Sequence, residues 1–359
     1  MRFILTGGGT LGSVTPLLAV AAELRSLQPS AEFQWFGTFG GPERSLVERA
    51  GIPFVALSSG KLRRYLSVEN ALDIGRIGVG FATAFWHFGL ARPSLVLSAG
   101  AYVAVPVGYA AAAYGVPVLI HQQDVTPGLA NRLLAPIARA ITVAFPESAA
   151  GFTRSKVTVT GNPVRRELGS LPDRAAARRE LGLDPAMPTV VVTGGGTGAA
   201  TLNQLAAAAF TGAEPFQVLH LTGRGKVGEV QPRSRYHVLP FSEEPWVAFA
   251  AADVVVSRAG MGTLTELAAF RKAAVVVPMA GTHQEANAQL LAARGAAIVR
   301  HEASLTAAGL AGTVSELLSN AVQRQQLGDR LAELFPTGAA AAVARVALAQ
   351  LHPKLPNLA

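Results

Sequence analysis

Short apolar runs alternate along the chain with longer stretches of helical periodicity. The first run, FILT at 3–6, is followed by a glycine-rich loop and by the periodic stretch VTPLLAVAAEL at 14–24. The same succession returns at TVVVT (189–193), GGGTGAA and TLNQLAAAAF. Each succession is typical of a β-strand, a tight loop and an α-helix. Because the two lie half a chain apart, they indicate two similar domains rather than a short-period repeat.

Further apolar runs without polar alternation predict the remaining strands. They lie at 32–37, 54–57, 95–100, 117–123 and 140–145, and again at 216–223, 236–239, 253–260, 273–278 and 296–299. Alanine-rich helical stretches separate them. Continuous apolar strands joined by helices indicate parallel sheets that are covered on both faces. The expected fold class is therefore α/β, with two doubly wound, Rossmann-like domains facing each other across a cleft.

The pattern breaks at two places that predict domain boundaries. Gly161, Asn162 and Pro163 interrupt it within VTVTGNPVRREL, and FPTGAAAA interrupts it again around Pro336. A last helix is expected near 339–351. The prediction is an N-terminal domain over 1–161, a C-terminal domain over 162–338, and a helix within 339–359 that returns to either domain.

Composition excludes several classes of protein. A length of 359 residues suits two domains, and 50% hydrophobic residues exclude a disordered chain. The lack of cysteine excludes a disulfide scaffold or a thiolate zinc site. No segment resembles a membrane-spanning helix or a secretory signal, so a cytoplasmic protein is expected. The net charge of +8 suits an anionic partner or reflects arginine-rich composition alone. No recognition motif for nucleic acid is present, so none is expected as a partner.

Three glycine-rich loops follow predicted strands. GGGTLG and GGGTGA match G-x-G-x-x-G/A, in which the backbone approaches a phosphate at a helix N-terminus. A nicotinamide site also requires an acidic residue after the next strand, and the segments WFGTFG and HLTGR contain none. The third loop, in DVVVSRAGMGTLTELAAF, opens a helix that suits an anion. Glu266 in that helix either accepts hydrogen bonds from ribose hydroxyls or belongs to a capping box.

Seven segments make the chain resemble the MurG family of GT-B glycosyltransferases. In order they are GGGTLGSVTPLLAVA, LVLSAGAYVAVP, HQQDVTPGLANRLLA, TGNPVRREL, VTGGGTGAATLNQ, DVVVSRAGMGTLTELAA and HQEANAQLL, and together they span essentially the whole chain. The resemblance implies the GT-B architecture and inverting transfer of N-acetylglucosamine from UDP-GlcNAc. The implied acceptor is the undecaprenyl-pyrophosphoryl-muramoylpentapeptide lipid of peptidoglycan synthesis, at the cytoplasmic face of the cell membrane.

The resemblance places the donor in the C-terminal domain. It implies that Glu266 binds the ribose and that Gln284 binds the sugar. His283 and Asn287 cluster with Gln284 at the start of a predicted helix, where their side chains can form hydrogen bonds with sugar hydroxyls. Arg258 or Arg165 is expected to neutralise the diphosphate. The other expected donor-binding residues are Gly195, Gly196, Thr197, Gly198, Phe241, Ser242, Gly260, Met261, Gly262, Thr263, Leu264 and Thr265.

The N-terminal domain is expected to hold the acceptor. The expected acceptor- and phosphate-binding residues are Gly9, Thr10, Leu11, Gly12, Ser13, Tyr102 and Asn131. The chain departs here from the family pattern GGTGGH, because Leu11 replaces a glycine and Ser13 replaces the histidine. The family pattern HEQN is also altered, to HQQD at 121–124. Two alternatives therefore stay open: a related UDP-sugar transferase with another lipid or glycan acceptor, and a non-catalytic UDP-sugar-binding subunit.

The transfer requires a base for the acceptor hydroxyl. Asp124 is the first candidate and His121 the second, because both follow the apolar run PVLI at the expected carboxyl edge of a sheet. The alternative is that Asp124 caps a helix beginning near Pro127. No Asp-x-Asp pair follows a strand, so neither a divalent metal nor another cofactor is expected in the chemical step.

An aromatic helix with basic neighbours predicts contact with a membrane. The segment IGRIGVGFATAFWHFGLARP contains Ile77, Phe81, Phe85 and Trp86, and the basic residues nearby are Lys61, Arg63, Arg64, Arg76 and Arg92. Such a surface is attracted to anionic lipid. The alternative is that these aromatic side chains pack on the sheet.

Overall fold

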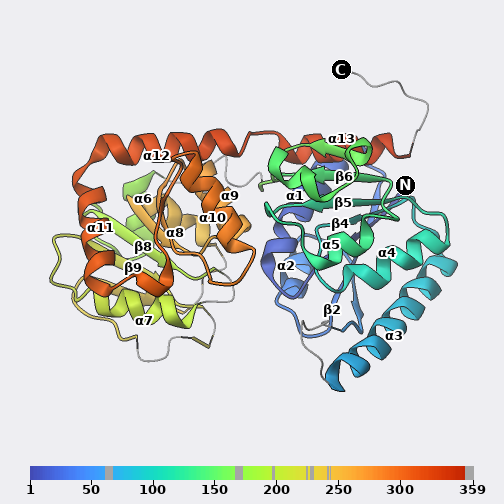
Figure 1. The fold of residues 1–359 in the computed structure, drawn as a ribbon, viewed down its shortest axis with the longest axis horizontal. Helices are drawn as coiled ribbons and strands as arrows, with labels where there is room; N and C mark the ends of the chain where they lie inside the picture. The colour runs from blue at the N-terminus through green and yellow to red at the C-terminus, as the bar shows by residue number, and fades with distance from the viewer. Residues whose placement is uncertain are drawn as a thin grey trace. The chain divides into compact units, whose positions relative to one another are not determined.

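The chain forms two compact units in a computed structural model. Unit 1 comprises Met1–Arg165 with Thr337–Ala359, and unit 2 comprises Arg166–Pro336. The structure describes residues 1–60, 68–165, 173–195, 199–223, 225–226, 230–240, 242 and 244–351. Figure 1 shows the order of the elements along the chain.

Unit 1 contains a seven-stranded parallel sheet in the order β3-β2-β1-β4-β5-β6-β7. Its strands are β1 (Arg2–Thr6), β2 (Glu32–Thr38), β3 (Phe54–Leu57), β4 (Leu95–Ser98), β5 (Val118–Gln122), β6 (Ala140–Val143) and β7 (Val157–Val159). Its helices are α1 (Thr15–Leu27), α2 (Glu43–Arg49), α3 (Val68–Leu90), α4 (Ala104–Ala113), α5 (Leu129–Leu134) and α13 (Ala339–Ala349), with 3₁₀ helices at Leu11–Ser13, Pro146–Gly151 and Arg154–Lys156.

Both faces of this sheet are buried. Successive side chains of a strand point to opposite faces, so Phe3 and Leu5 of β1 join one core with α1 and α13. Ile4 joins the other core, which includes residues of α3 and α4. Figure 1 shows α1 and α13 side by side over the sheet, and the two helices are in contact. Burial on both faces explains why these strands are continuously apolar.

Unit 2 contains a six-stranded parallel sheet in the order β10-β9-β8-β11-β12-β13. Its strands are β8 (Thr189–Thr193), β9 (Gln217–Leu221), β10 (Tyr236–Leu239), β11 (Val254–Ser257), β12 (Ala273–Val276) and β13 (Ile298–Val299). Its helices are α6 (Arg174–Glu180), α7 (Ala200–Ala209), α8 (Pro245–Ala251), α9 (Met261–Ala269), α10 (Gln284–Ala293), α11 (Ala307–Ser319) and α12 (Ala321–Leu334), with a 3₁₀ helix at Glu302–Ser304.

The two parallel sheets confirm the predicted α/β class. Every apolar run that predicts a strand contains one, and β7 is an additional edge strand whose short, partly exposed sequence VTV gave no apolar signal. The contacts divide the chain at Arg165 and Pro336, and α13 packs within unit 1.

One stretch among the described residues, 321–349, reaches the length and mean hydropathy of a membrane-spanning helix. It consists of two helices, α12 and α13, because Gly338 adopts a left-handed conformation with φ of 85° between them. Leu327 and Leu331 of α12 and Val343 and Ala347 of α13 are buried in their own units. The apolar side chains of α12 and α13 therefore pack against the cores of their own units.

Candidate active site

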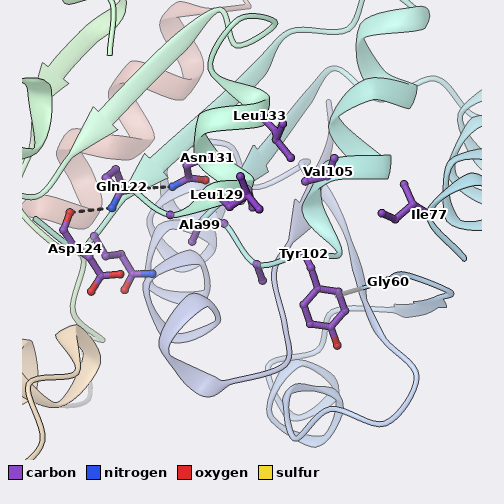
Figure 2. A pocket seen from close by; sticks show the side chains of 15 residues that line it. Gly60, Ile77, Ala99, Tyr102, Val105, Gln122, Asp124, Leu129, Asn131 and Leu133 are labelled. Carbon is purple, nitrogen blue, oxygen red and sulfur yellow. Dashed lines mark hydrogen bonds between the residues drawn. The ribbon is translucent and has the colours of Figure 1, made fainter. Parts of the chain in front are cut away.

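A pocket of about 300 Å³ lies at the carboxyl ends of β4 and β5 in unit 1. Its walls come from residues 99–105 after β4, 122–124 at the end of β5, and 128–133 in and before α5, together with Gly60 and Ile77. Figure 2 shows Gln122, Asp124 and Asn131 at one end and Tyr102 and Ile77 toward the other. Ligands of open α/β sheets bind in this kind of crevice.

Hydrogen bonds fix the polar end of the pocket. Asn131 Nδ2 donates to Gln122 Oε1 at 2.7 Å, and Gln122 Nε2 donates to the Asp124 carbonyl at 2.8 Å. The Ser148 hydroxyl donates to the same carbonyl at 3.0 Å. Asp124 is half-buried and lines the pocket. The alternative that Asp124 caps a helix is wrong, because α5 begins at Leu129 with Gly128 as its N-cap and has no side-chain cap.

His121 lies inside the sheet rather than in the pocket. Its Nδ1 is 3.0 Å from Thr142 Oγ1 and its Nε2 is 2.9 Å from Asn162 Oδ1. An amide oxygen only accepts, so Nε2 carries the proton and Nδ1 accepts from the threonine hydroxyl. Burial lowers the pKa of His121 to about 4, against a smaller opposing effect of the Asn162 hydrogen bond. This geometry contradicts the prediction that His121 is a second candidate base, and it indicates that the ring positions Asn162.

A pH-dependent loss of stability follows from this burial. Desolvation also lowers the pKa of His220 in unit 2 to about 4, from 6.5. Because the folded pKa values lie below the unfolded one, the unfolded chain binds more protons between pH 6.5 and 4. We expect the contribution of both rings to the free energy of unfolding to fall as the pH decreases through this window. NMR titration of the histidine rings checks the cause, and rings of His121 and His220 that titrate near pH 6.5 would contradict it.

The first glycine loop is held by side chains from β2, α2 and the loop itself. The Gly7 carbonyl accepts from Trp35 Nε1 at 3.0 Å, and Gly8 N donates to Ser13 Oγ at 3.1 Å. Gly9 N donates to Glu43 Oε2 at 3.2 Å. Ser13 therefore closes the loop by its hydroxyl.

Glu43 is a functional candidate that sequence reasoning missed. The residue is fully buried, and its Oε1 accepts from Thr38 N at 2.8 Å and from Thr38 Oγ1 at 2.5 Å. In the sequence it looks only like an acidic residue in the first turn of a helix. Because its carboxylate holds the Gly9 amide, the prediction that Gly9 and Ser13 bind phosphate is not supported by the geometry. Thr10, Leu11 and Gly12 form the more exposed part of the loop.

In unit 2, the β8 loop and the start of α9 lie next to each other. Gly195 has φ of 78°, and a Cβ there would lie 3.8 Å from Thr263 Oγ1. Glu266 is half-buried and lies beyond the first turn of α9, which begins at Met261 and has no side-chain cap. The capping-box alternative for Glu266 is therefore wrong. Met261, Leu264 and Thr265 are buried, and the Thr265 hydroxyl donates to the Met261 carbonyl at 2.7 Å, so these side chains support the helix.

The remaining predicted donor residues differ in their surroundings. Arg258 is buried and forms an ion pair with Glu302 at 2.5 Å, which contradicts its predicted use in neutralising a diphosphate. Asn287 is buried and donates to the Ala259 carbonyl at 3.0 Å, so it ties α10 to the loop after β11. Gln284 Oε1 accepts from Met279 N at 3.1 Å.

The other predicted donor residues are half-buried or exposed, or lie outside the part of the chain that the structure describes. Gly260 and Gly262 are half-buried beside Thr263, and His283 is exposed at the N-cap of α10. Ser242 Oγ accepts from Glu244 N at 3.1 Å. Arg165 is half-buried at the end of unit 1. Gly196, Thr197, Gly198 and Phe241 lie outside the described residues.

A buried network behind the β9 loop was also missed by sequence reasoning. His220 Nδ1 lies 2.7 Å from the Tyr236 hydroxyl, and His220 Nε2 lies 3.0 Å from Asn203 Oδ1. Asn203 Nδ2 donates to the Thr222 and Lys226 carbonyls at 2.9 and 3.1 Å. The network fixes the loop at the carboxyl end of β9. Its three side chains lie far apart in the sequence, so the sequence alone does not reveal that they interact.

The aromatic helix α3 is used in two ways. Phe81 is half-buried and packs on the core, and Phe85 lies 4.6 Å from Tyr114 between ring centroids. Trp86 is 68% exposed, and Leu72, Val79 and Leu90 on the same stripe are also exposed. Ile77 is half-buried in the pocket wall. Lys61, Arg63 and Arg64 lie outside the described residues.

Comparison with known proteins identifies the family. The profile of the glycosyltransferase family 28 N-terminal domain matches residues 3–143, and that of its C-terminal domain matches residues 189–342. A Lachnoclostridium phytofermentans protein named "UDP-N-acetylglucosamine--N-acetylmuramyl-(pentapeptide) pyrophosphoryl-undecaprenol N-acetylglucosamine transferase" is 36% identical over 326 residues, covering 89% of this chain and 91% of its own length. A Nocardioides sp. protein of the same name is 36% identical over 361 residues, covering 97% and 98%.

A solved structure agrees with these relatives over almost the full length. The crystal structure of Acinetobacter baumannii MurG matches with a TM-score of 0.72 and 28% identity, covering 97% of this chain and 99% of that chain. The chain belongs to glycosyltransferase family 28 and, within it, to the MurG transferases.

Proposed function

We propose that the protein transfers N-acetylglucosamine from UDP-GlcNAc to the undecaprenyl-pyrophosphoryl-muramoylpentapeptide lipid. The names of its relatives support this donor and acceptor. The observation that carries the proposal is the Asp124 carboxylate at the rim of the unit 1 pocket. Gln122 and Ser148 hold the backbone of Asp124, so the residue that carries the carboxylate is fixed at the pocket wall.

In the proposed reaction Asp124 accepts the proton of the acceptor hydroxyl. The hydroxyl oxygen forms a bond to the anomeric carbon, and the bond from that carbon to the diphosphate oxygen breaks. UDP leaves with the electron pair, and direct attack inverts the anomeric centre. A positioned base typically contributes a factor of about 10²–10⁴ to the rate. His121 is not used as a base, because its buried ring is neutral and both its nitrogens are bonded.

Unit 2 supplies the donor site in this proposal. Glu266 accepts hydrogen bonds from the ribose, and the amide groups at the start of α9 stabilise the charge that develops on the diphosphate. Arg165 adds a positive charge. The proposal includes no divalent metal in the chemical step, because no Asp-x-Asp pair follows a strand.

Release of UDP from UDP-GlcNAc tests the function. Strong release that depends on a short-chain muramoylpentapeptide pyrophosphoryl-lipid analogue supports the proposal. UDP-GlcNAc binding without such release would reject the acceptor and favour another lipid or glycan. The second candidate rests on the changed first loop, where Leu11 adds a side chain and Ser13 replaces a histidine.

We also propose that α3 places unit 1 on the cytoplasmic face of the membrane. Leu72, Val79, Trp86 and Leu90 are 58%, 57%, 68% and 70% exposed and recur at helical spacing along one stripe. Arg76 lies beside this stripe, where it pairs with Asp73 at 2.8 Å, and Arg92 follows the helix and donates to the Tyr114 carbonyl. An exposed apolar stripe with cationic neighbours suits an anionic lipid surface.

Replacing Trp86 and Leu90 by glutamate tests the membrane contact. We expect binding to anionic vesicles to weaken at least about tenfold, because each large apolar side chain gains ~1.5–3 kcal/mol on burial. Co-sedimentation with phosphatidylglycerol vesicles measures this. The control is Val322→Glu on α12, since Val322 is 67% exposed. Equal vesicle binding by the double variant and the control would reject α3 as the contact.

A further inference from the structure

One side-chain acceptor in the unit 1 pocket lacks a donor. Asn131 is 4% exposed and lines the pocket, and among the described residues its Oδ1 has no hydrogen-bond partner. The amide is correctly oriented, because Nδ2 has two acceptors, Gln122 Oε1 at 2.7 Å and the His121 carbonyl at 3.3 Å. A buried acceptor without a donor is unfavourable unless a ligand supplies one.

Glycine at position 100 keeps a side chain away from this oxygen. A Cβ at Gly100 would lie 3.3 Å from Asn131 Oδ1, so any other residue there would cover it. Gly100 has φ of 91° and Ala101 has φ of 70°, which turns the backbone away directly after β4. The oxygen has almost no exposed surface, so binding of a ligand donor there requires its neighbours to move slightly.

The groups around this oxygen exclude a phosphate. Asp124 contributes a carboxylate to the same end of the pocket, and Asn131 presents an acceptor. A pyrophosphate has no hydrogen to donate at neutral pH and is repelled by a carboxylate. Of the two roles expected for this set of residues, acceptor binding and phosphate binding, the geometry favours acceptor binding for Asn131.

The walls next to Asn131 are apolar and small. Ala99 and Leu129 line the pocket, and Figure 2 shows both near Asn131. A ligand group that fits both the unpaired oxygen and the apolar wall has one polar hydrogen and a short apolar end. A secondary amide with a small acyl group has this chemistry, whereas a hydroxyl lacks the apolar end.

We propose that this pocket binds the acylamino group of the acceptor sugar, with the amide N–H donating to Asn131 Oδ1 and the acyl methyl packing on Ala99 and Leu129. This inference rests on the proposed function and names a subsite of its acceptor. In this proposal the acylamino group belongs to the same ring as the attacking hydroxyl. Gln122 bonds to both Asn131 and the Asp124 backbone, so one side chain connects the subsite to the candidate base. Recognition of the acyl group therefore orients the hydroxyl toward Asp124.

Three acceptor analogues test the subsite. They carry acetamido, acetoxy or hydroxyl at one position of the muramoyl ring and are otherwise identical. The acetoxy group keeps the acyl end and loses the N–H. We expect wild-type kcat/KM to be lower by about fivefold or more for the acetoxy analogue, because Oδ1 then stays unpaired. Equal values for acetamido and acetoxy would overturn the proposal.

Two variants separate the hydrogen bond from the apolar wall. In Asn131→Leu the acetamido-to-acetoxy ratio is expected to fall toward one, while the preference for either over hydroxyl remains. In Leu129→Ser the acetamido-to-acetoxy ratio is expected to remain, while the preference over hydroxyl falls. Leu129 is 53% exposed, so this second variant keeps the test intact if Asn131→Leu does not fold. Ratios unchanged in folded variants would overturn the assignment.

Binding without turnover separates this inference from the proposed function. Saturation-transfer NMR compares the methyl glycosides of N-acetylmuramic acid and of its 2-O-acetyl analogue on the wild-type protein. Preferential binding of the amide supports the subsite even if no UDP is released, in which case only the proposed function fails. Absence of any preference rejects the subsite even if lipid-dependent UDP release is strong.

Discussion

Asp124→Asn is expected to reduce acceptor-dependent UDP release by a factor of about 10²–10⁴, the usual contribution of a positioned base. The amide keeps the size of the side chain, and the hydrogen bonds from Gln122 and Ser148 to the backbone carbonyl of position 124 do not depend on the carboxylate. Affinity for UDP-GlcNAc is expected to change little. Steady-state kinetics with saturating acceptor measures the turnover, and calorimetry measures donor binding.

A matched substitution controls for loss of a carboxylate in unit 1. Glu48 is an exposed carboxylate on α2 that pairs with Arg44 at 2.8 Å, and Glu48→Gln is expected to have normal turnover. Near-normal turnover of Asp124→Asn would show that Asp124 only contacts the ligand. The base would then have to be sought elsewhere, since His121 is fully buried with both nitrogens bonded.

Most of the fold is predictable from the sequence because the signals are local. A parallel strand that is buried on both faces is a continuous apolar run, so β5 and β11 are evident from PVLI and VVV. The strand β7 was missed because Val159 is 51% exposed, and an edge strand of three residues has no apolar signature. The helix α13 packs on α1 from the other end of the chain, and no local pattern specifies that contact.

The candidate site was predictable in part. Loops that follow apolar strands mark the carboxyl edges of the sheets, so Asp124 and Asn131 were found by position. Whether a polar side chain faces the ligand or the interior depends on neighbours that are distant in sequence. Arg258 is bound by Glu302 and His121 by Asn162, and these partners are not evident from either local segment.

The same reason explains why Glu43 was overlooked. Its role depends on three donors, two from Thr38 and one from Gly9, which meet only when β1 and β2 pair. The altered residue Ser13 then has a structural explanation, since its hydroxyl accepts from Gly8 N within the same loop. This departure from the family pattern is thus accommodated by an internal hydrogen bond.

Glu266→Ala is expected to weaken UDP-GlcNAc binding roughly 10- to 150-fold, because a hydrogen bond to a charged group contributes about 1.5–3 kcal/mol. Glu266 lies beyond the first turn of α9, and the N-terminus of that helix has no side-chain cap. The control is Glu285→Ala, which removes another half-buried carboxylate from unit 2. Comparison of UDP-GlcNAc with its 2′-deoxyribose analogue identifies the bond: the wild type is expected to prefer the ribose, and Glu266→Ala is expected to lose that preference. If folded Glu266→Ala still prefers the ribose over the 2′-deoxyribose, the Glu266 carboxylate does not accept the hydrogen bond, and another group holds the ribose.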